Sequence, residues 1–285
     1  LLKSLIAGGV AGMCSKTTVA PLDRIKILLQ AHNKYYKHLG VLSGLREVIQ
    51  RERFFALYKG NFAQMIRIFP YAATQFTTFE LYKNSLLYLC LFGKHTHIDK
   101  FLAGSAAGVT AVTLTYPLDI IRARLAFQVA GEHIYIGIVH AGITIFKNEG
   151  GIRALYRGFW PTIFGMIPYA GFSFYSFEKL KYFCMKNTVL TIPARLLCGG
   201  IAGAVAQSFS YPLDVTRRHM QLGIMHHANH KYSYTIKMIY KENGIIKGLY
   251  RGMSINYLRA IPMVSVSFTT YEIMKQILQL DTINT

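Results

Sequence analysis

Hydrophobic residues in this chain occur in long blocks separated by polar stretches, and the blocks predict helices. The three longest windows without a charged residue are residues 101–118, 159–177 and 196–213. They approach the roughly 20 apolar residues that a membrane-spanning helix needs. Three shorter windows, residues 4–15, 68–79 and 260–271, reach that length only if one or two charges are admitted. Such charges should face a protein interior or a watery cavity. The pattern predicts six membrane spans.

The polar stretches between the windows contain amphipathic pieces. In residues 41–52 the apolar side chains Val41, Leu42, Leu45, Val48 and Ile49 share one face of a helix. The chain is therefore expected to alternate span, polar connection and span, with both termini on one side of the membrane.

A tripeptide shows that the chain is an internal repeat. Pro-Leu-Asp begins at Pro21, Pro117 and Pro212, so the intervals are 96 and 95 residues. A basic residue follows each proline by five positions. We expect three repeats, over residues 1–92, 93–187 and 188–285.

Three further elements recur at the same period. Each repeat has a GxxxG pair, a Tyr-base-Gly tripeptide and an aromatic-Glu-x-x-Lys sequence. The elements begin at Gly8, Gly104 and Gly199, at Tyr58, Tyr156 and Tyr250, and at Phe79, Phe177 and Tyr271. The GxxxG pairs predict close helix packing.

Composition and charge support a membrane protein. The chain is 52% hydrophobic and only 16% charged, whereas soluble domains have about 25% charged residues. The net charge of +19 is spread between apolar spans, which favours an anionic lipid or solute over nucleic acid as partner. The cysteines Cys14, Cys90, Cys184 and Cys198 are too scattered to predict a disulfide or metal site. No nucleophile, base and acid group together, so we expect neither an enzyme nor a cofactor.

With these motifs the chain resembles the mitochondrial carriers over essentially its whole length. That family has Pro-x-acid-x-x-base at the end of odd helices, aromatic-base-Gly before even helices and aromatic-acid-x-x-base near their ends. The resemblance implies an all-α membrane protein with six transmembrane helices in three tandem hairpins, related by pseudo-threefold symmetry. An acid-Gly pair expected before the aromatic is intact at Glu149-Gly150 but reads Glu52-Arg53 and Glu242-Asn243 elsewhere.

The repeated prolines and charges predict a two-gated cavity. Proline inside a helix removes a hydrogen bond, so Pro21, Pro117 and Pro212 should kink three helices at equal depth. The resemblance implies a matrix gate that pairs Asp23 with Arg122, Asp119 with Arg217, and Asp214 with Lys26. It implies a cytoplasmic gate that pairs Glu80 with Lys181, Glu178 with Lys275, and Glu272 with Lys83. Ordinary interfacial ion pairs are the alternative for any one of them.

A substrate lacks threefold symmetry, so positions that differ among the repeats should determine specificity. Thirteen residues before the repeated glutamates stand Arg67, Gly165 and Arg259. Arginine binds phosphate bidentately, and a charge at membrane depth suggests function. Lys16 is a third cation at such depth, and we expect none of the three cations to have a repeat-encoded acidic partner.

The resemblance assigns roles to these positions. Arg67, Gly165 and Arg259 match the family's substrate contact points, and Gly165-Met166 is similar to the adenine nucleotide class. Lys16 matches a substrate lysine of ADP/ATP carriers, and Tyr169 matches a tyrosine near their adenine, although Tyr169 could instead pack between helices.

Longer segments resemble the coenzyme A carrier subgroup, which includes the Graves disease carrier protein. These segments begin at Lys16, Ile66, Arg124 and Pro168. The expected function is exchange of coenzyme A, against an adenine nucleotide or adenosine 3',5'-bisphosphate, by a monomer in the mitochondrial inner membrane. An ATP-magnesium/phosphate or other adenine nucleotide carrier, and a channel or leak pathway, are the alternatives. Cardiolipin is the expected bound lipid at the Tyr-base-Gly tripeptides, where plain interface anchoring is the alternative.

Overall fold

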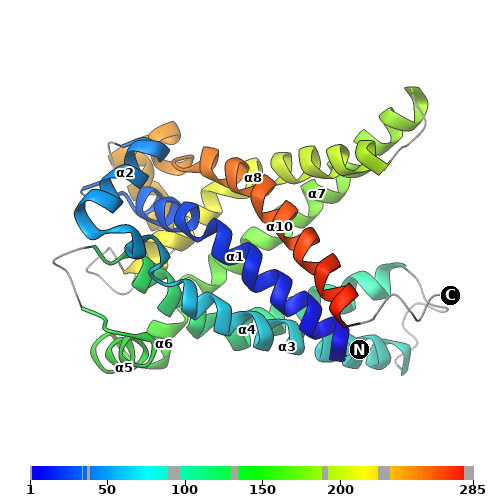
Figure 1. The fold of residues 1–285 in the computed structure, drawn as a ribbon, viewed down its shortest axis with the longest axis horizontal. Coiled ribbons are helices and arrows are strands. Elements are labelled where there is room, and N and C mark those ends of the chain that lie inside the picture. The colour runs from blue at the N-terminus through cyan, green and yellow to red at the C-terminus, as the bar shows by residue number, and fades with distance from the viewer. Residues whose placement is uncertain are drawn as a thin grey trace. The chain divides into compact units, whose positions relative to one another are not determined.

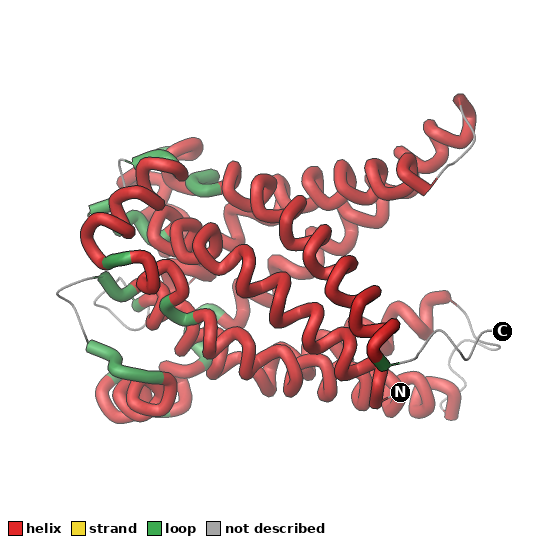
Figure 2. The backbone as a smooth tube through the Cα atoms, viewed as in Figure 1, coloured by secondary structure: helices red, strands yellow, loops and turns green. Residues whose placement is uncertain are grey.

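The described part of the protein is built from helices. The computed structural model describes residues 2–33, 35–36, 39–88, 97–129, 134–187, 192–223 and 232–278. Over these ranges every regular element is helical (Figure 2). Cys90 and the expected repeat boundaries at residues 92 and 188 lie outside them.

Six long helices contain the six apolar windows predicted from the sequence. They are α1 (Leu2–Gln30), α3 (Asn61–Tyr88), α4 (His97–Phe127), α7 (Phe159–Asn187), α8 (Ile192–Leu222) and α10 (Met253–Ile277) (Figure 1). Helices α3, α7 and α10 each begin directly after a Tyr-base-Gly tripeptide. Among the helices of the described ranges, none is both long and apolar enough to cross a membrane.

Short elements occupy the polar connections. They are α2 (Val41–Glu52), a 3-10 turn η1 (Phe54–Tyr58), α5 (Ile138–Asn148), α6 (Ile152–Leu155), α9 (Tyr232–Asn243) and a π-helical turn η2 (Ile245–Leu249). Helix α2 has the bounds of the amphipathic segment predicted above, and its Val48 is fully buried.

The chain forms two compact units. The first unit comprises Leu1–Ile27, His38–Tyr156 and Leu258–Thr285, and in it α3 packs along α4. The second unit comprises Leu28–Lys37 and Arg157–Tyr257, and in it α7 packs along α8. The core of the second unit includes Tyr211, Val215 and Ile239, against which Leu249, Tyr250 and Met253 pack.

The first long helix of each repeat, α1, α4 and α8, packs through a stripe of small residues that the sequence reasoning missed. A Cβ atom added at Gly108 would meet nothing within 4 Å, and one at Gly104 would lie 3.9 Å from the Phe79 ring. The predicted close packing is therefore wrong at Gly108, whereas Gly104 lies at ordinary van der Waals distance from Phe79. The buried stripe stands one residue earlier, and because its members are four residues apart they share one helix face. It consists of Ala7, Ala11 and Ser15 on α1, Ala103, Ala107 and Ala111 on α4, and Cys198, Ala202 and Ala206 on α8.

Two tyrosines of the Tyr-base-Gly tripeptides, Tyr156 and Tyr250, lie against α4 and α8 near the motif prolines. Helix α4 continues through Pro117, whose ring leaves the Thr113 carbonyl without its usual donor. The Tyr156 hydroxyl donates to that carbonyl at 3.1 Å, and the Tyr156 ring stacks on Tyr116 with centroids 5.8 Å apart. The three proline kinks themselves stay a prediction.

The second unit repeats this stack. Tyr211, the residue before Pro212, stacks on Tyr250 with centroids 6.2 Å apart, and its hydroxyl donates to the Arg251 carbonyl at 2.7 Å. The tripeptide that precedes α7 is thus bonded to α4 in the first unit, and the tripeptide that precedes α10 is bonded to α8 in the second.

The glycine of the first tripeptide is expected to be irreplaceable. Gly60 has φ +82°, and an added Cβ atom would lie 2.8 Å from the Arg122 carbonyl oxygen. Gly60→Ala should lower the free energy of unfolding by about 1–3 kcal/mol, because the side chain forces both strain and a backbone shift. Gly108→Ala is the matched control, since its Cβ enters open space. Thermal unfolding in detergent measures both, and equal midpoints for the two variants would show that Gly60 is not constrained.

Candidate functional site

Three cations predicted from the broken symmetry lie in the first unit. Lys16 is on α1, Arg67 on α3 and Arg259 on α10. The Lys16 ammonium lies 3.5 Å from the Met263 sulfur. The contacts of Arg67 and Arg259 involve the acids of the proline motifs.

Arg67 is held by three side chains. One of its terminal nitrogens forms an ion pair with Asp119 Oδ1 at 3.0 Å, and its Nε donates to Thr115 Oγ1 at 3.3 Å. Its guanidinium also lies over the Tyr71 ring, 5.4 Å from the centroid, at a distance where a cation is attracted to an aromatic face. The Arg67 side chain is 21% exposed, whereas Asp119 is nearly fully buried. Arg67 is therefore oriented in advance but still reachable.

Asp23 is shared by two arginines of the first unit. One carboxylate oxygen accepts from Arg122 at 2.7 Å, and the other forms an ion pair with Arg259. The residue is only 5% exposed. A buried carboxylate is stable only when its oxygens are paired, and here two guanidinium groups meet that need.

These contacts correct one expectation. Arg67 and Arg259 were predicted to lack a repeat-encoded acidic partner, and that prediction is wrong, because Asp119 and Asp23 are their partners. The sequence could not show this, since Arg259 and Asp23 are 236 residues apart and belong to different motifs. A carboxylate has two oxygens and can therefore serve two motifs at once.

The residues of the predicted matrix gate lie at the prolines of the odd helices. Asp23 and Arg122, which the family pattern pairs, are in contact. The other two predicted pairs, Asp119 with Arg217 and Asp214 with Lys26, each join residues of different units and stay predictions. Within the second unit, the Gln207 amide donates to Asp214 at 2.8 Å.

Of the predicted cytoplasmic-gate pairs, Glu272 with Lys83 is the one whose two residues lie in the same unit and in the described ranges, and this pair is not formed. The structure records no ion pair between the described residues Lys83 and Glu272, and Glu272 instead lies 3.9 Å from Lys275 of its own helix. Glu80 on α3 is exposed, as are Glu178 and Lys181 on α7. In the first unit, the pair at the proline end is formed while the pair at the other end is not.

The remaining predicted substrate residues belong to the second unit. On α7, Met166 and Tyr169 are 37% and 41% exposed. The Gly165 carbonyl accepts from Ser210 Oγ at 3.3 Å, and an added Cβ atom at Gly165 would lie 3.6 Å from Leu213. An exposed ring beside a glycine suits a flat ligand, but whether Tyr169 binds adenine stays a prediction.

The contacts add three residues that the sequence reasoning missed. Thr115 and Tyr71 hold Arg67, and Met263 lies against Lys16. A signal for two of them was present, because Tyr71 and Met263 stand four residues after Arg67 and Arg259, as Tyr169 does after Gly165. The side chain one helical turn beyond each contact point is thus large in all three repeats.

Three sequence repeats that each supply two long helices, with ion pairs buried at Pro21 and Pro117 and with cations within reach of solvent, are typical of a solute carrier. The model of the mitochondrial carrier protein family matches residues 1–88, 93–188 and 189–282. The chain therefore belongs to the mitochondrial carrier family, whose members are transporters and not enzymes, and it is a mitochondrial membrane protein.

Relatives agree with this assignment. Solute carrier family 25 member 16 of Homo sapiens is 54% identical over an alignment that covers 98% of this chain and 89% of that protein. The mitochondrial coenzyme A transporter SLC25A42 of Xenopus tropicalis is 42% identical, covering 98% of this chain and 86% of that protein. The mitochondrial carrier protein CoAc1 of Zea mays is 41% identical, covering 97% and 87%. These names match the subgroup that the sequence segments suggested.

The gate pairing can be tested by reversing a charge pair. Asp23→Lys should strongly impair transport, because three cations would then meet at a nearly dry position. Adding Arg122→Asp should restore part of the activity, since one pair is reversed while Arg259 still lacks its acid. A double-mutant cycle on transport rates measures the coupling, and a double variant no better than either single variant would refute the pairing.

Proposed function

We propose that this carrier moves coenzyme A across the mitochondrial inner membrane, in exchange for an adenine nucleotide or adenosine 3',5'-bisphosphate. The observation that supports this most is the cluster of Lys16, Arg67 and Arg259 in one unit, two of them with guanidinium groups already oriented. Guanidinium forks bind phosphate oxygens bidentately, and coenzyme A presents several phosphates. Relatives named coenzyme A transporters support the same substrate.

The contacts of the two arginines suggest how solute binding is coupled to the gate. The acids Asp119 and Asp23 form ion pairs with Arg67 and Arg259. A solute phosphate competes for the same guanidinium groups and leaves the acids less well paired. Leaving a buried acid without its partner is costly, so the phosphate must contribute enough binding energy to offset the pairs that it loosens. Solute binding thereby weakens the group of charges that includes the Asp23–Arg122 pair.

Tyr169, in the second unit, is the proposed adenine contact. The ring is partly exposed and stands one helical turn beyond Gly165. Stacking of a base on an aromatic ring contributes about 1–3 kcal/mol in nucleic-acid complexes.

Cardiolipin is the proposed bound lipid of a monomeric carrier. A cavity of about 720 Å³ in the first unit lies beside the start of α3 and the start of α5, and its lining includes Tyr58, Lys59, Gly60, Gly137 and Ile138. Apolar walls, a lysine and free amides at helix starts suit a lipid phosphate with its acyl chains.

Uptake into liposomes separates the candidate functions. Purified protein is expected to exchange radiolabelled coenzyme A against internal adenosine 3',5'-bisphosphate. Preferred uptake of ATP with phosphate would instead assign an ATP-magnesium/phosphate or adenine nucleotide carrier. Passage without a counter-substrate and without saturation would indicate a channel or leak, because a carrier must turn over for each solute.

The phosphate site is tested in the same liposomes. Arg67→Ala and Arg259→Ala should each reduce coenzyme A exchange by at least about a hundredfold, as when a buried charged hydrogen-bond donor is lost. Arg153→Ala, at an exposed position on α6, is the control. Normal exchange by both arginine variants would exclude the proposed site.

If Asp119 and the solute phosphate compete for Arg67, removing the acid should strengthen solute binding, whereas removing the arginine should weaken it. Asp119→Asn removes the charge that holds Arg67, so coenzyme A should bind about three- to tenfold more tightly, equivalent to roughly 1 kcal/mol. Isothermal titration of the detergent-solubilised variant measures this. Weaker binding than in the wild type would show that Asp119 positions Arg67 for the solute and does not compete with it.

A further inference from the structure

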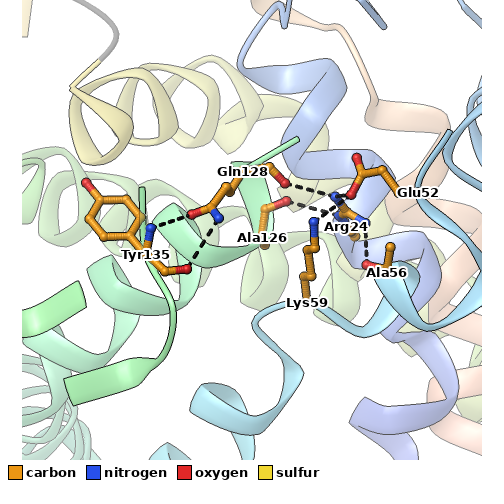
Figure 3. Close-up of polar contacts among 7 residues, drawn as sticks. All are labelled: Arg24, Glu52, Ala56, Lys59, Ala126, Gln128 and Tyr135. Carbon is orange, nitrogen blue, oxygen red and sulfur yellow. Dashed lines mark hydrogen bonds and ion pairs between the residues drawn. The ribbon is translucent and has the colours of Figure 1, made fainter. Parts of the chain in front are cut away.

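Arg24, the residue after Asp23, is a cation outside the proposed site that forms several bonds (Figure 3). Its side chain lies on α1 and is 1% exposed. It forms an ion pair with Glu52 at 2.7 Å and donates to three backbone carbonyls. These belong to Ala126 at 3.2 Å, Gln128 at 3.0 Å and Ala56. The guanidinium thus touches α1, the α2–η1 connection and the end of α4.

The repeats show that this arginine is an exception. The positions three residues after the other two motif prolines are Ile120 and Val215, which are fully buried aliphatic residues. A charge in such a place is costly unless every donor is bonded. Arg24 therefore replaces an apolar packing contact with a set of directed bonds.

Two of the three carbonyls stand at the end of a helix. Helix α4 ends at Phe127, and the last carbonyls of a helix have no partner within it. The C-terminal end also bears the negative pole of the helix dipole, which favours a nearby cation. Arg24 supplies donor and charge together, so that a side chain of the first repeat caps a helix of the second.

Neighbouring groups hold the guanidinium in place. Glu52 also forms an ion pair with Lys59 at 2.7 Å, and its side chain is 1% exposed. Burial alone would raise the pKa of the Glu52 carboxyl, but the hydrogen bonds from Lys59 and Arg24 outweigh it and keep the pKa below its usual value. The Gln128 side chain bonds to both the backbone N–H and the carbonyl of Tyr135, which fastens the chain beyond α4.

From this geometry we infer that Arg24 is a positioning residue for the gate, a latch that holds the end of α4 against α1 and must release before the Asp23–Arg122 pair can part. Both contacts join the same two helices. Asp23 directly precedes Arg24, and Arg122 stands one helical turn before Ala126. The inference rests on the proposed carrier function, because a latch matters only if the gate opens.

Arg124 offers a matched control. Its guanidinium binds both oxygens of Glu149, at 3.0 and 2.7 Å, and lies 3.5 Å from the Tyr135 hydroxyl. These contacts stay within the second repeat. Loss of Arg124 should weaken the fold locally without releasing α4 from α1.

The test compares Arg24→Gln with Arg124→Gln in liposomes loaded with coenzyme A. We measure release without a counter-substrate relative to exchange, a ratio that a merely structural defect would not change. Arg24→Gln should raise the ratio about tenfold, because several charge-assisted bonds that close the gate are lost. Arg124→Gln should leave it within about twofold of the wild type, since its contacts lie elsewhere. An unchanged ratio for Arg24→Gln, or an equal rise for both variants, would overturn the latch.

Two further measurements keep the inference testable. If Arg24→Gln does not fold, Arg24→Lys keeps the pair with Glu52 but cannot reach all carbonyls, and it should raise the ratio by a smaller factor.

If the wild type moves none of the adenine anions, the proposed function fails and transport cannot test the latch. The labelling rate of Val129→Cys, at a buried position beyond α4, then decides. It should rise with Arg24→Gln and not with Arg124→Gln, and no difference would overturn the latch.

Discussion

The described structure of the first unit depends on the desolvated carboxylate of Asp23. A carboxylate so nearly buried must have partners for both oxygens, and the available partners are guanidinium groups from α4 and α10. Three helices from three repeats are therefore held by one side chain of α1. Asp119 does the same on a smaller scale for α3 and α4 through Arg67.

This arrangement makes the proposed solute site and the predicted gate parts of one charge network. Arg67 and Arg259 belong to α3 and α10, each the second long helix of its repeat, whereas the gate base Arg122 belongs to α4. Both Arg67 and Arg259 remain partly exposed. A solute that binds them acts directly on the acids that close the proline end of the unit. Arg24 adds bonds that no solute reaches, because its side chain is buried between α1 and the end of α4.

The sequence predicted the elements of this fold well because they recur. Six apolar windows lie within six long helices, the amphipathic segment is α2, and the even helices begin after the Tyr-base-Gly tripeptides. Asymmetry between the repeats was enough to single out Arg67 and Arg259 as candidates, and their role in solute binding stays a prediction. The repeat pattern could not predict which side chains are in contact. Arg259 and Asp23 are 236 residues apart, and their contact depends on the tertiary fold. The same limit explains why the glycines, and not Ala103 and Ala107, were predicted as the helix-packing positions. Both sets of small residues repeat with equal spacing.

Arg24 was overlooked for a different reason. It stands inside the Pro-Leu-Asp motif, where attention falls on the residues that repeat, and the departure at this position is visible only when Ile120 and Val215 are set beside it. Two of its partners are backbone carbonyls at the end of α4, and no sequence motif encodes those acceptors. Functional residues that bond to the backbone are therefore harder to predict than those that pair with side chains.

Amide hydrogen exchange of residues 115–129, measured with and without coenzyme A, tests the central claim most directly. That claim is that solute phosphates and gate acids share Arg67 and Arg259. Binding usually slows exchange near a site. If the solute instead draws the arginines away from Asp119 and Asp23, coenzyme A should speed exchange at the end of α4. Slower or unchanged exchange in this segment, at saturating coenzyme A, would contradict the shared network.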